Sequence, residues 1–520
     1  MSVPLQATPP VEYPEKIDAA VLKVAGVVVL GAIMSILDIT VVNVALPTFQ
    51  RVFATGGEQQ LAYSTVAWTV TAYTLALATV IPLTGWAADR FGTKRLYMLA
   101  LVLFTAGSVL CASATSIGML IGFRVLQGLG GGMLMPLGMT IMTKAAGPKR
   151  MGRLMAILGI PMLLGPICGP ILGGWLIQSV NWHWIFLINL PIGVAAVAYA
   201  SWALQKDDPH PTESLDVLGV ALMSPGLAAF LYGVSTIPAE RTFASAKVLV
   251  PMIAGLVLIV LFVLHTFRPE HPLLDLRLFA NRDLRAATIT MFLFGAAFFG
   301  GLLLVPTYFQ QVRGESTLNA GLLVAPQGIG AMMTMPIAGA LSDRLPVGRI
   351  VPFGLLLITG GMFALTQVTS TISYTTLIVI LFVMGLGMGM TMMPIMTSAL
   401  RTLQASAVAR GSTLLNIVQQ IASSVGVAVM SVILTNNLDS YPLARPATFS
   451  WFDPSIAAKL GPAGLAEGLA DAAKAFSSTY WVAGVLVALT FLPALMLPRK
   501  REVTHLTDGT EASAAPVVLH

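Results

Sequence analysis

The sequence predicts an all-α polytopic membrane protein with fourteen transmembrane helices, and three observations lead to this prediction. Only 10 % of the 520 residues are charged and 56 % are hydrophobic, whereas soluble domains carry about 25 % charged residues. Apolar runs of the length that a helix needs to cross a bilayer recur along the chain. These runs are continuous and do not alternate with period two, which excludes barrel strands. The same composition excludes a set of soluble domains and a disordered chain, and the 2 cysteines exclude a disulfide scaffold.

Each predicted span is an apolar run bounded by charged or turn-forming residues, and backbone satisfaction inside lipid requires it to be helical. The Gly- and Pro-rich runs 154–178 and 318–341 fit this pattern least well. The spans are 23–46, 64–86, 96–114, 119–142, 154–178, 184–204, 215–234, 248–267, 286–310, 318–341, 350–368, 374–398, 411–434 and 478–497.

The basic residues predict the orientation of the chain. Of the 29 lysines and arginines, 21 fall on the side of the two termini, 7 fall on the other side, and Arg124 lies within a span. Basic residues concentrate on the cytoplasmic side of membrane proteins. We therefore expect a multi-pass protein of the cytoplasmic (inner) membrane with both termini in the cytoplasm.

An internal repeat predicts the domain organisation. The segment 85–95 (GWAADRFGTKR) is echoed by 339–349 (GALSDRLPVGR), and the segment 128–136 is echoed by 385–394. In both cases the second copy lies eight predicted helices after the first. The simplest account is two parallel six-helix bundles, at 23–204 and 286–497, with a transmembrane hairpin at 215–267 inserted between them. The remaining predicted parts are the tails 1–22 and 498–520 and a long extracytoplasmic loop at 435–477, in which 463–476 could form an amphipathic helix.

Four motifs resemble the major facilitator superfamily, and specifically its fourteen-helix drug:proton antiporters of the EmrB/QacA type. They are LDITVVNVALP at 37–47, GWAADRFGTKR at 85–95, RVLQG at 124–128 and GPICGPILGG at 165–174. The resemblance implies a transporter that works by alternating access and exports its substrate in exchange for protons. It also implies that the fourth motif, with Gly165, Gly169, Pro170, Gly173 and Gly174, serves antiport. One departure is Leu381, which occupies the position of Arg124 in the second half.

Two charged residues within the apolar spans are the candidates for proton coupling. Asp38 is the single carboxylate that we place inside a span, and Arg124 is the single basic residue there. A charge at the bilayer centre is costly and indicates function by default. Asp38 could bind and release a proton as the cavity alternates between the two sides, and Arg124 could promote the release if the two lie close. The alternatives are a structural hydrogen bond for Asp38 and a bracing role for Arg124.

Further polar residues in the spans are candidates for the substrate cavity: Asn43, Gln127, Asn416, Gln419 and Gln420. The last three share one helix face, and amides avoid lipid. The alternative is hydrogen bonding between helices.

The charges of the repeated loop suit a cytoplasmic gate, whose candidates are Asp89, Arg90, Arg95, Asp343 and Arg344. Charge pairs there could hold one conformation and release in the other; alternatively, these charges only fix the topology.

The sequence thus predicts a proton-coupled exporter of amphipathic, lipophilic or cationic drugs. We expect no enzyme activity, no metal, no cofactor and no nucleic-acid partner, because the six histidines are dispersed and no phosphate-binding loop is present. We expect a monomer whose partners are the substrate, protons and the bilayer; an envelope adaptor stays possible. One alternative is the same fold exporting a dedicated metabolite, lipid-like compound or siderophore. A second is a non-transporting membrane scaffold or sensor, for which the short cytoplasmic loops offer little room.

Overall fold

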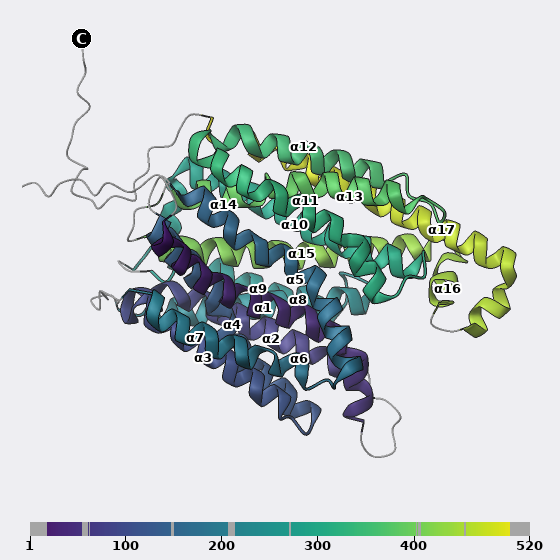
Figure 1. Cartoon of the computed structure of the whole chain (residues 1–520), viewed down its shortest axis with the longest axis horizontal. Coiled ribbons are helices and arrows are strands. Elements are labelled where there is room, and N and C mark those ends of the chain that lie inside the picture. Colours follow the sequence, from purple (N-terminus) through teal and green to yellow (C-terminus); the bar gives the residue numbers. More distant parts are fainter. Residues whose placement is uncertain are drawn as a thin grey trace, which may run out of the picture.

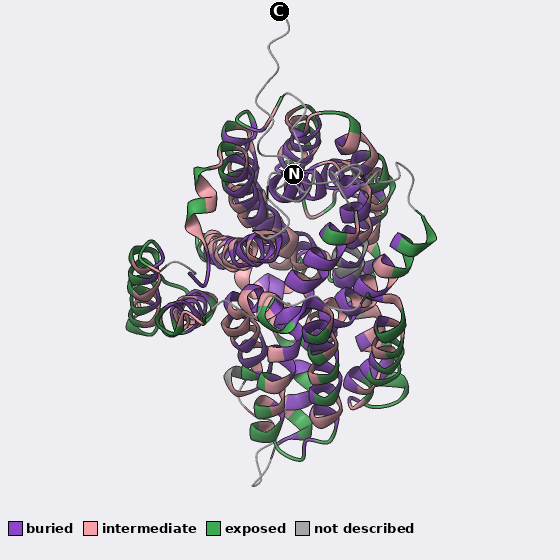
Figure 2. Cartoon of the chain, turned by 90° about the vertical axis from the view of Figure 1, so that its left-hand side faces the viewer, coloured by how far each residue is buried: buried purple, intermediate pink, exposed green. Residues whose placement is uncertain are grey.

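The structure is a computed structural model that describes residues 18–54, 61, 63–146, 150–205, 214–269, 272–401, 403, 407–451 and 454–499. Within these ranges all regular structure is helical (Figure 1). Most of the two predicted tails lies outside the described residues. The helices lie roughly along one direction, with buried residues on their inner faces and exposed residues around the outside (Figure 2).

The N-terminal helices form one packed group. Helix α4 packs against α2 and α3, α5 packs against α1, and α7 packs against α3. Asp18 begins the first of them because its carboxylate accepts the backbone N–H of Val21 at 2.8 Å. The group comprises α1 (Ala19–Val52), α2 (Tyr63–Phe91), α3 (Thr93–Ala112), α4 (Ile117–Ala146), α5 (Met151–Ser179), α6 (Trp184–Leu187) and α7 (Asn189–Ala203).

The C-terminal helices form a second packed group. Helix α10 packs against α15 and α17, while α13 packs against α11 and α12. The group comprises α10 (Arg282–Gln311), α11 (Thr317–Arg344), α12 (Val347–Leu365), α13 (Tyr374–Gly389), α14 (Met392–Arg401), α15 (Val408–Asp439), α16 (Ala444–Phe449), α17 (Pro454–Leu489) and α18 (Phe491–Ala494).

Between the two groups in the chain lie α8 (Val217–Glu240) and α9 (Ala246–His265), followed by the short 3₁₀ helix η1 (Leu276–Ala280). The two helices pack against each other, and α8 also contacts α2 of the first group and α15 of the second.

Thirteen helices of the described chain are long and apolar enough to cross a membrane. The remaining predicted span, 154–178, corresponds to α5, which runs unbroken through Pro161, Pro166 and Pro170 but is not among the thirteen. An all-helical polytopic fold is thus confirmed, and the count of fourteen stays a prediction.

Three predicted segments differ from the structure. The segment 435–477, predicted as a long loop in which 463–476 could be helical, is largely helical: α15 continues to Asp439, α16 follows, and α17 begins at Pro454. An Ala-rich stretch carries no strong apolar periodicity, which explains why most of this helical structure was not predicted. The predicted spans 374–398 and 184–204 are each present as one apolar segment, Tyr374–Arg401 and Trp184–Ala203, with a break between α13 and α14 and between α6 and α7.

The two groups meet mainly through two pairs of helices, α5 with α11 and α2 with α15, and also through α5 with α14 and α4 with α15. The α5–α11 and α2–α15 pairs correspond to each other, because the repeat relates α2 to α11 and α5 to α15. In Figure 1 the groups lie close at the left-hand end and diverge toward the right-hand end.

Candidate functional site

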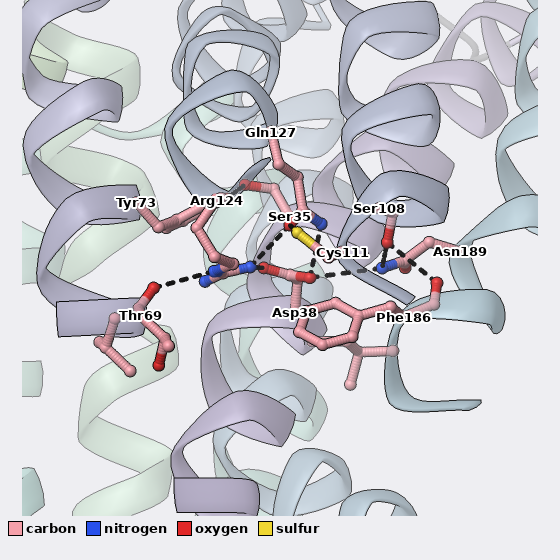
Figure 3. A network of polar contacts seen from close by, with 12 residues as sticks. Ser35, Asp38, Thr69, Tyr73, Ser108, Cys111, Arg124, Gln127, Phe186 and Asn189 are labelled. Carbon is pink, nitrogen blue, oxygen red and sulfur yellow. Dashed lines mark hydrogen bonds and ion pairs between the residues drawn. The ribbon is translucent and has the colours of Figure 1, made fainter. Parts of the chain in front are cut away.

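Asp38 lies in a buried polar network inside the N-terminal group (Figure 3). Its Oδ2 forms an ion pair with Nη1 of Arg124 from α4, and both side chains are fully buried. Its Oδ1 accepts hydrogen bonds from Nε2 of Gln127 at 2.7 Å and, more weakly, from Nδ2 of Asn189 at 3.4 Å. The carboxylate of Asp38 is therefore contacted by three donor side chains, which come from α4 and α7.

The guanidinium of Arg124 is held on several sides. Its Nε donates to the backbone oxygen of Thr69 at 3.0 Å, and Nη1 also donates to Oε1 of Gln127 at 2.8 Å. The guanidinium carbon lies 4.1 Å from the ring centroid of Tyr73, a cation–π contact. Its Nη2 is buried and has no hydrogen-bond partner among the described residues. The pair is therefore anchored to α2 and α4 and retains one unused donor.

Glycines bring the helices close enough to bury this network. A Cβ at Gly107 of α3 would lie 2.7 Å from Cα of Gln127, and one at Gly128 would lie 2.5 Å from the backbone oxygen of Tyr73. Without side chains at these positions α3 and α2 approach α4 closely. The close packing excludes water from the pair of charges.

A central cavity of about 570 Å³ lies between the two groups. Its wall comes from α1, α2 and α4 on one side and from α10, α11, α13, α14 and α15 on the other. The lining is mainly apolar, with Phe298, Phe299 and Met388 among its larger side chains, and none of the lining residues is charged. Such a wall of aromatic rings and flexible thioethers suits apolar ligands of varied shape.

Four of the five predicted cavity residues line this cavity: Asn43, Asn416, Gln419 and Gln420. The fifth, Gln127, points into the Asp38 network instead. Asp38 itself is not part of the lining, although Ser35, Ile39 and Thr40 of the same helix are. Helix α1 thus presents its carboxylate to the interior of the N-terminal group and a different face to the cavity.

The glycines of the fourth motif pack against α1. A Cβ at Gly165 would overlap Ile36, a Cβ at Gly169 would overlap Thr40, and one at Gly173 would lie 3.1 Å from Val41. Gly174 differs, because a Cβ there would meet nothing within 4 Å. The side chain of Pro170 lies outside the described residues.

The predicted gate residues lie at the end where the two groups meet. Asp343 at the end of α11 accepts from the N-terminal group through the backbone N–H of Gly152 at 2.8 Å and through Nε of Arg153 at 3.0 Å. It also accepts from Nη2 of Arg401 at 2.8 Å. In the first copy of the repeat, Asp89 of α2 lies 3.8 Å from Nε of Arg410 on α15. Each aspartate therefore reaches across to the other group.

The arginines predicted for the gate behave differently from the aspartates. Arg90, Arg95 and Arg344 are exposed, and no pairing of Arg344 with Asp343 is seen among the described residues. The partners of Asp343 come instead from α5 and α14. Gly339 supports this contact, because a Cβ there would lie 2.6 Å from the backbone oxygen of Gly152.

Sequence reasoning missed three polar residues at these sites. Asn189 donates to Asp38 and, at 3.0 Å, to Ser108, whose hydroxyl donates to the backbone oxygen of Phe186 at 2.9 Å. Gln327 of α11 lines the central cavity and donates to Sδ of Met388 at 3.2 Å. All three are uncharged polar residues within apolar spans, which is the only signal that could have found them.

Comparison with known proteins was made by sequence and by structure. A family model described as Major Facilitator Superfamily matches residues 28–427. A multidrug resistance protein B homolog of Mycobacterium tuberculosis is 46 % identical over 507 residues, covering 95 % of this chain and 93 % of that protein. The multidrug export protein EmrB of Escherichia coli is 28 % identical over 431 residues, covering 82 % and 83 % of the two chains.

Among solved structures, the proton:xylose symporter XylE aligns with a TM-score of 0.58 and 15 % identity, covering 91 % of this chain and 95 % of that one. At this identity the likeness concerns the fold.

Proposed function

Because this chain belongs to the Major Facilitator Superfamily, a family of membrane transporters, we propose that it is a proton-coupled exporter of amphipathic, lipophilic or cationic drugs. In this proposal the bundles 23–204 and 286–497 rock about the central cavity, with the hairpin 215–267 at their side. The observation that carries the proposal is the position of α1, which holds a buried carboxylate on one face and lines the cavity with another.

The cavity supports a substrate that is mainly apolar and carries at most one delocalised positive charge. Its wall offers aromatic rings and thioethers to apolar groups, and amides such as Asn43, Asn416 and Gln420 to polar ones. With no charged lining residue, a strongly charged substrate would lose its hydration without compensation. The names of the relatives as multidrug resistance and export proteins support the same class of substrate.

Proton coupling in this proposal operates through Asp38. While Asp38 is ionised, Arg124, Gln127 and Asn189 all donate to it and tie α1 to α4 and α7. Protonation removes the negative charge and replaces an acceptor by a donor, so the ion pair with Arg124 weakens. Helix α1 is then free to move, and the face that it presents to the cavity moves with it. The proton and the substrate therefore influence each other through one helix without sharing a binding site.

Alternation between the two open states is controlled, in this proposal, at the end of the molecule where α2 and α11 contact the other group. The bridges of Asp343 to Arg153 and of Asp89 to Arg410 cross from one group to the other, and they hold that end closed while both are intact. Breaking them lets the groups part there, as rigid-body switching requires.

We place the protein in the cytoplasmic membrane as a monomer with both termini in the cytoplasm, which the distribution of 21 basic residues against 7 supports.

The experiment that tests this function is transport into proteoliposomes with an imposed pH gradient. Wild type is expected to accumulate a fluorescent lipophilic cation only when the gradient is present. Asp38→Asn is expected to lose gradient-driven accumulation while still inserting and binding the dye. Lys459→Gln, a change at an exposed residue of α17, serves as the control and should match wild type.

Two results would contradict the proposal. Gradient-driven transport by Asp38→Asn at the wild-type rate would remove Asp38 from the coupling. A wild type that moves no dye of this class, but exports one metabolite, would favour the dedicated exporter.

A further inference from the structure

A second cavity lies at the end of the N-terminal group, away from the central cavity. Its volume is about 710 Å³, and it shares no lining residue with the central cavity. The starts of α1 and α3 and the ends of α4 and α7 surround it. It therefore lies on the side of the membrane that holds the N-terminus.

The lining of this pocket is positively charged. Lys23, Lys94 and Lys144 line it, and Asp18 is the single carboxylate among its described lining residues. Asp18 is already engaged, since its Oδ2 lies 3.2 Å from Nη1 of Arg150 and its Oδ1 accepts the backbone N–H of Val21. This N–H keeps the pKa of Asp18 below its ordinary value. The pocket thus has a surplus of positive charge, which favours an anion.

The polar groups of the pocket lie at the start of α3 and at the end of α7. Lys144 donates to the hydroxyl of Thr93 at 3.3 Å, and Lys94 closes the end of α7 by donating to the backbone oxygens of Ser201 at 2.8 Å and Leu204 at 2.6 Å. Helix α3 begins at Thr93, and its N-cap, Gly92, has no side chain that could accept the first amides. Ammonium groups, a hydroxyl and a helix N-terminus together match a phosphate group.

The rim of the pocket is apolar and faces outward. Nζ of Lys23 lies 4.5 Å from the ring centroid of Trp202, whose side chain is 67 % exposed. Leu22, beside Lys23 in the chain, is 51 % exposed. Tryptophan and lysine at the edge of a span are typical of the headgroup region of the bilayer. The ligand therefore joins a phosphate to an apolar body.

We propose that this pocket binds the phosphate of an anionic phospholipid from the leaflet on the side of the N-terminus. Basic pockets between transmembrane helices have the charge and shape for such headgroups. A bound phosphate would tie the starts of α1 and α3 to the end of α4. This proposal does not depend on the proposed proton coupling, because it uses none of the groups around Asp38.

The test is lipid binding to the full-length protein. Purified protein is reconstituted in phosphatidylcholine nanodiscs with increasing phosphatidylglycerol, and bound lipid is measured by native mass spectrometry after release. Lys23→Gln/Lys144→Gln is expected to bind phosphatidylglycerol more than about tenfold more weakly than wild type. Lys247→Gln/Lys459→Gln removes the same charge outside the pocket and should bind as wild type does. Lys23→Arg/Lys144→Arg keeps the charge and should retain binding.

Folding is checked by the melting temperature in pure phosphatidylcholine, where the glutamine variant is expected to match wild type. If inorganic phosphate alone protects the wild type and displaces phosphatidylglycerol at millimolar concentration, the ligand is free phosphate and the lipid assignment fails. If Lys23→Gln/Lys144→Gln and the control Lys247→Gln/Lys459→Gln bind phosphatidylglycerol equally, the lysines of the pocket act only as general surface charge, and the pocket is not a site.

Discussion

Asp38 and Arg124 each depend on the other for burial. A carboxylate or a guanidinium alone in this water-free position would lose its hydration with nothing in return. Together, and with Gln127 and Asn189, they satisfy most of their hydrogen-bonding groups. The pair is thus stable when ionised and costly to leave half-complete. This is the property that a site needs if the state of one proton is to alter the packing of a helix.

A double-mutant cycle tests this dependence. Removing one partner of a buried ion pair typically costs about 3–5 kcal/mol, so we expect losses of this order in the free energy of unfolding for Asp38→Asn and for Arg124→Gln. The double variant is expected to lose less than the sum, with a coupling of about 0.5–3 kcal/mol. Free energies are measured by denaturant titration in detergent.

Lys474→Gln serves as the matched control, because its pair with Asp471 lies at the surface, where Lys474 is 64 % exposed. Exposed pairs contribute about 0–1 kcal/mol. Additive losses for Asp38 and Arg124 would show that the two do not interact in the protein.

The residues of the Asp38 network and of the central cavity differ in how far the sequence alone predicts them. Asp38 and Arg124 stand out because charge within an apolar span is rare, and the structure brings them together. Asn189 and Gln327 do not stand out, because an amide in a span is compatible with simple helix packing. The placement of Gln127 in the cavity was wrong, because one helix face can serve two neighbours and only the fold shows which side chain meets which.

At the scale of elements, α1 is held by two neighbouring helices, α4 and α5. Its carboxylate is held by α4, while its neighbouring face packs against the glycines of α5. Ile36 and Thr40 touch these glycines and also line the central cavity. A motion of α1 therefore requires α5 to accommodate it. This requirement explains why small residues recur along α5 at the positions that face α1.

Replacing one of these glycines tests the contact. Gly169→Ala would place its Cβ on Thr40, and overpacking of this kind costs about 1–3 kcal/mol. We expect a lower melting temperature and reduced transport. Gly174→Ala meets open space and is expected to stay within about 0.5 kcal/mol of wild type. Equal effects of the two changes would mean that helix propensity, and not contact with α1, governs α5.

At the scale of the whole molecule, the repeat explains how the two groups are joined. Each copy places an aspartate at the end of a helix and a glycine one turn earlier, and both residues contact the other group. Asp89 and Gly85 approach Arg410 and Thr413 of α15, whereas Asp343 and Gly339 approach α5. The sequence predicted the aspartates but assigned Arg344 to the gate. The true partners lie far apart in the chain, and no pattern within the repeat could identify them.

The fold as a whole was largely predictable, because lipid permits few solutions for an apolar chain. Of the helical segment at 435–477 only the stretch 463–476 was expected to be helical, since outside the membrane an Ala-rich sequence can form a helix or a loop with little difference in pattern. Packing then decides, as at Trp451, whose Nε1 donates to the backbone oxygen of Gln311 at 3.1 Å.

The measurement that tests the central claim most directly is the opening of the gate as a function of pH. Spin labels replace Phe91 and Leu345, which are exposed near the gate, and Cys168 is changed to serine. In the proposed mechanism protonation of Asp38 releases α1, so acidification is expected to lengthen the distance in wild type. Asp343→Asn should open the gate at every pH, and Arg344→Gln should leave the wild-type response unchanged. The account predicts that Asp38→Asn, neutral at every pH, shows the long distance throughout; a pH response equal to that of wild type would contradict it.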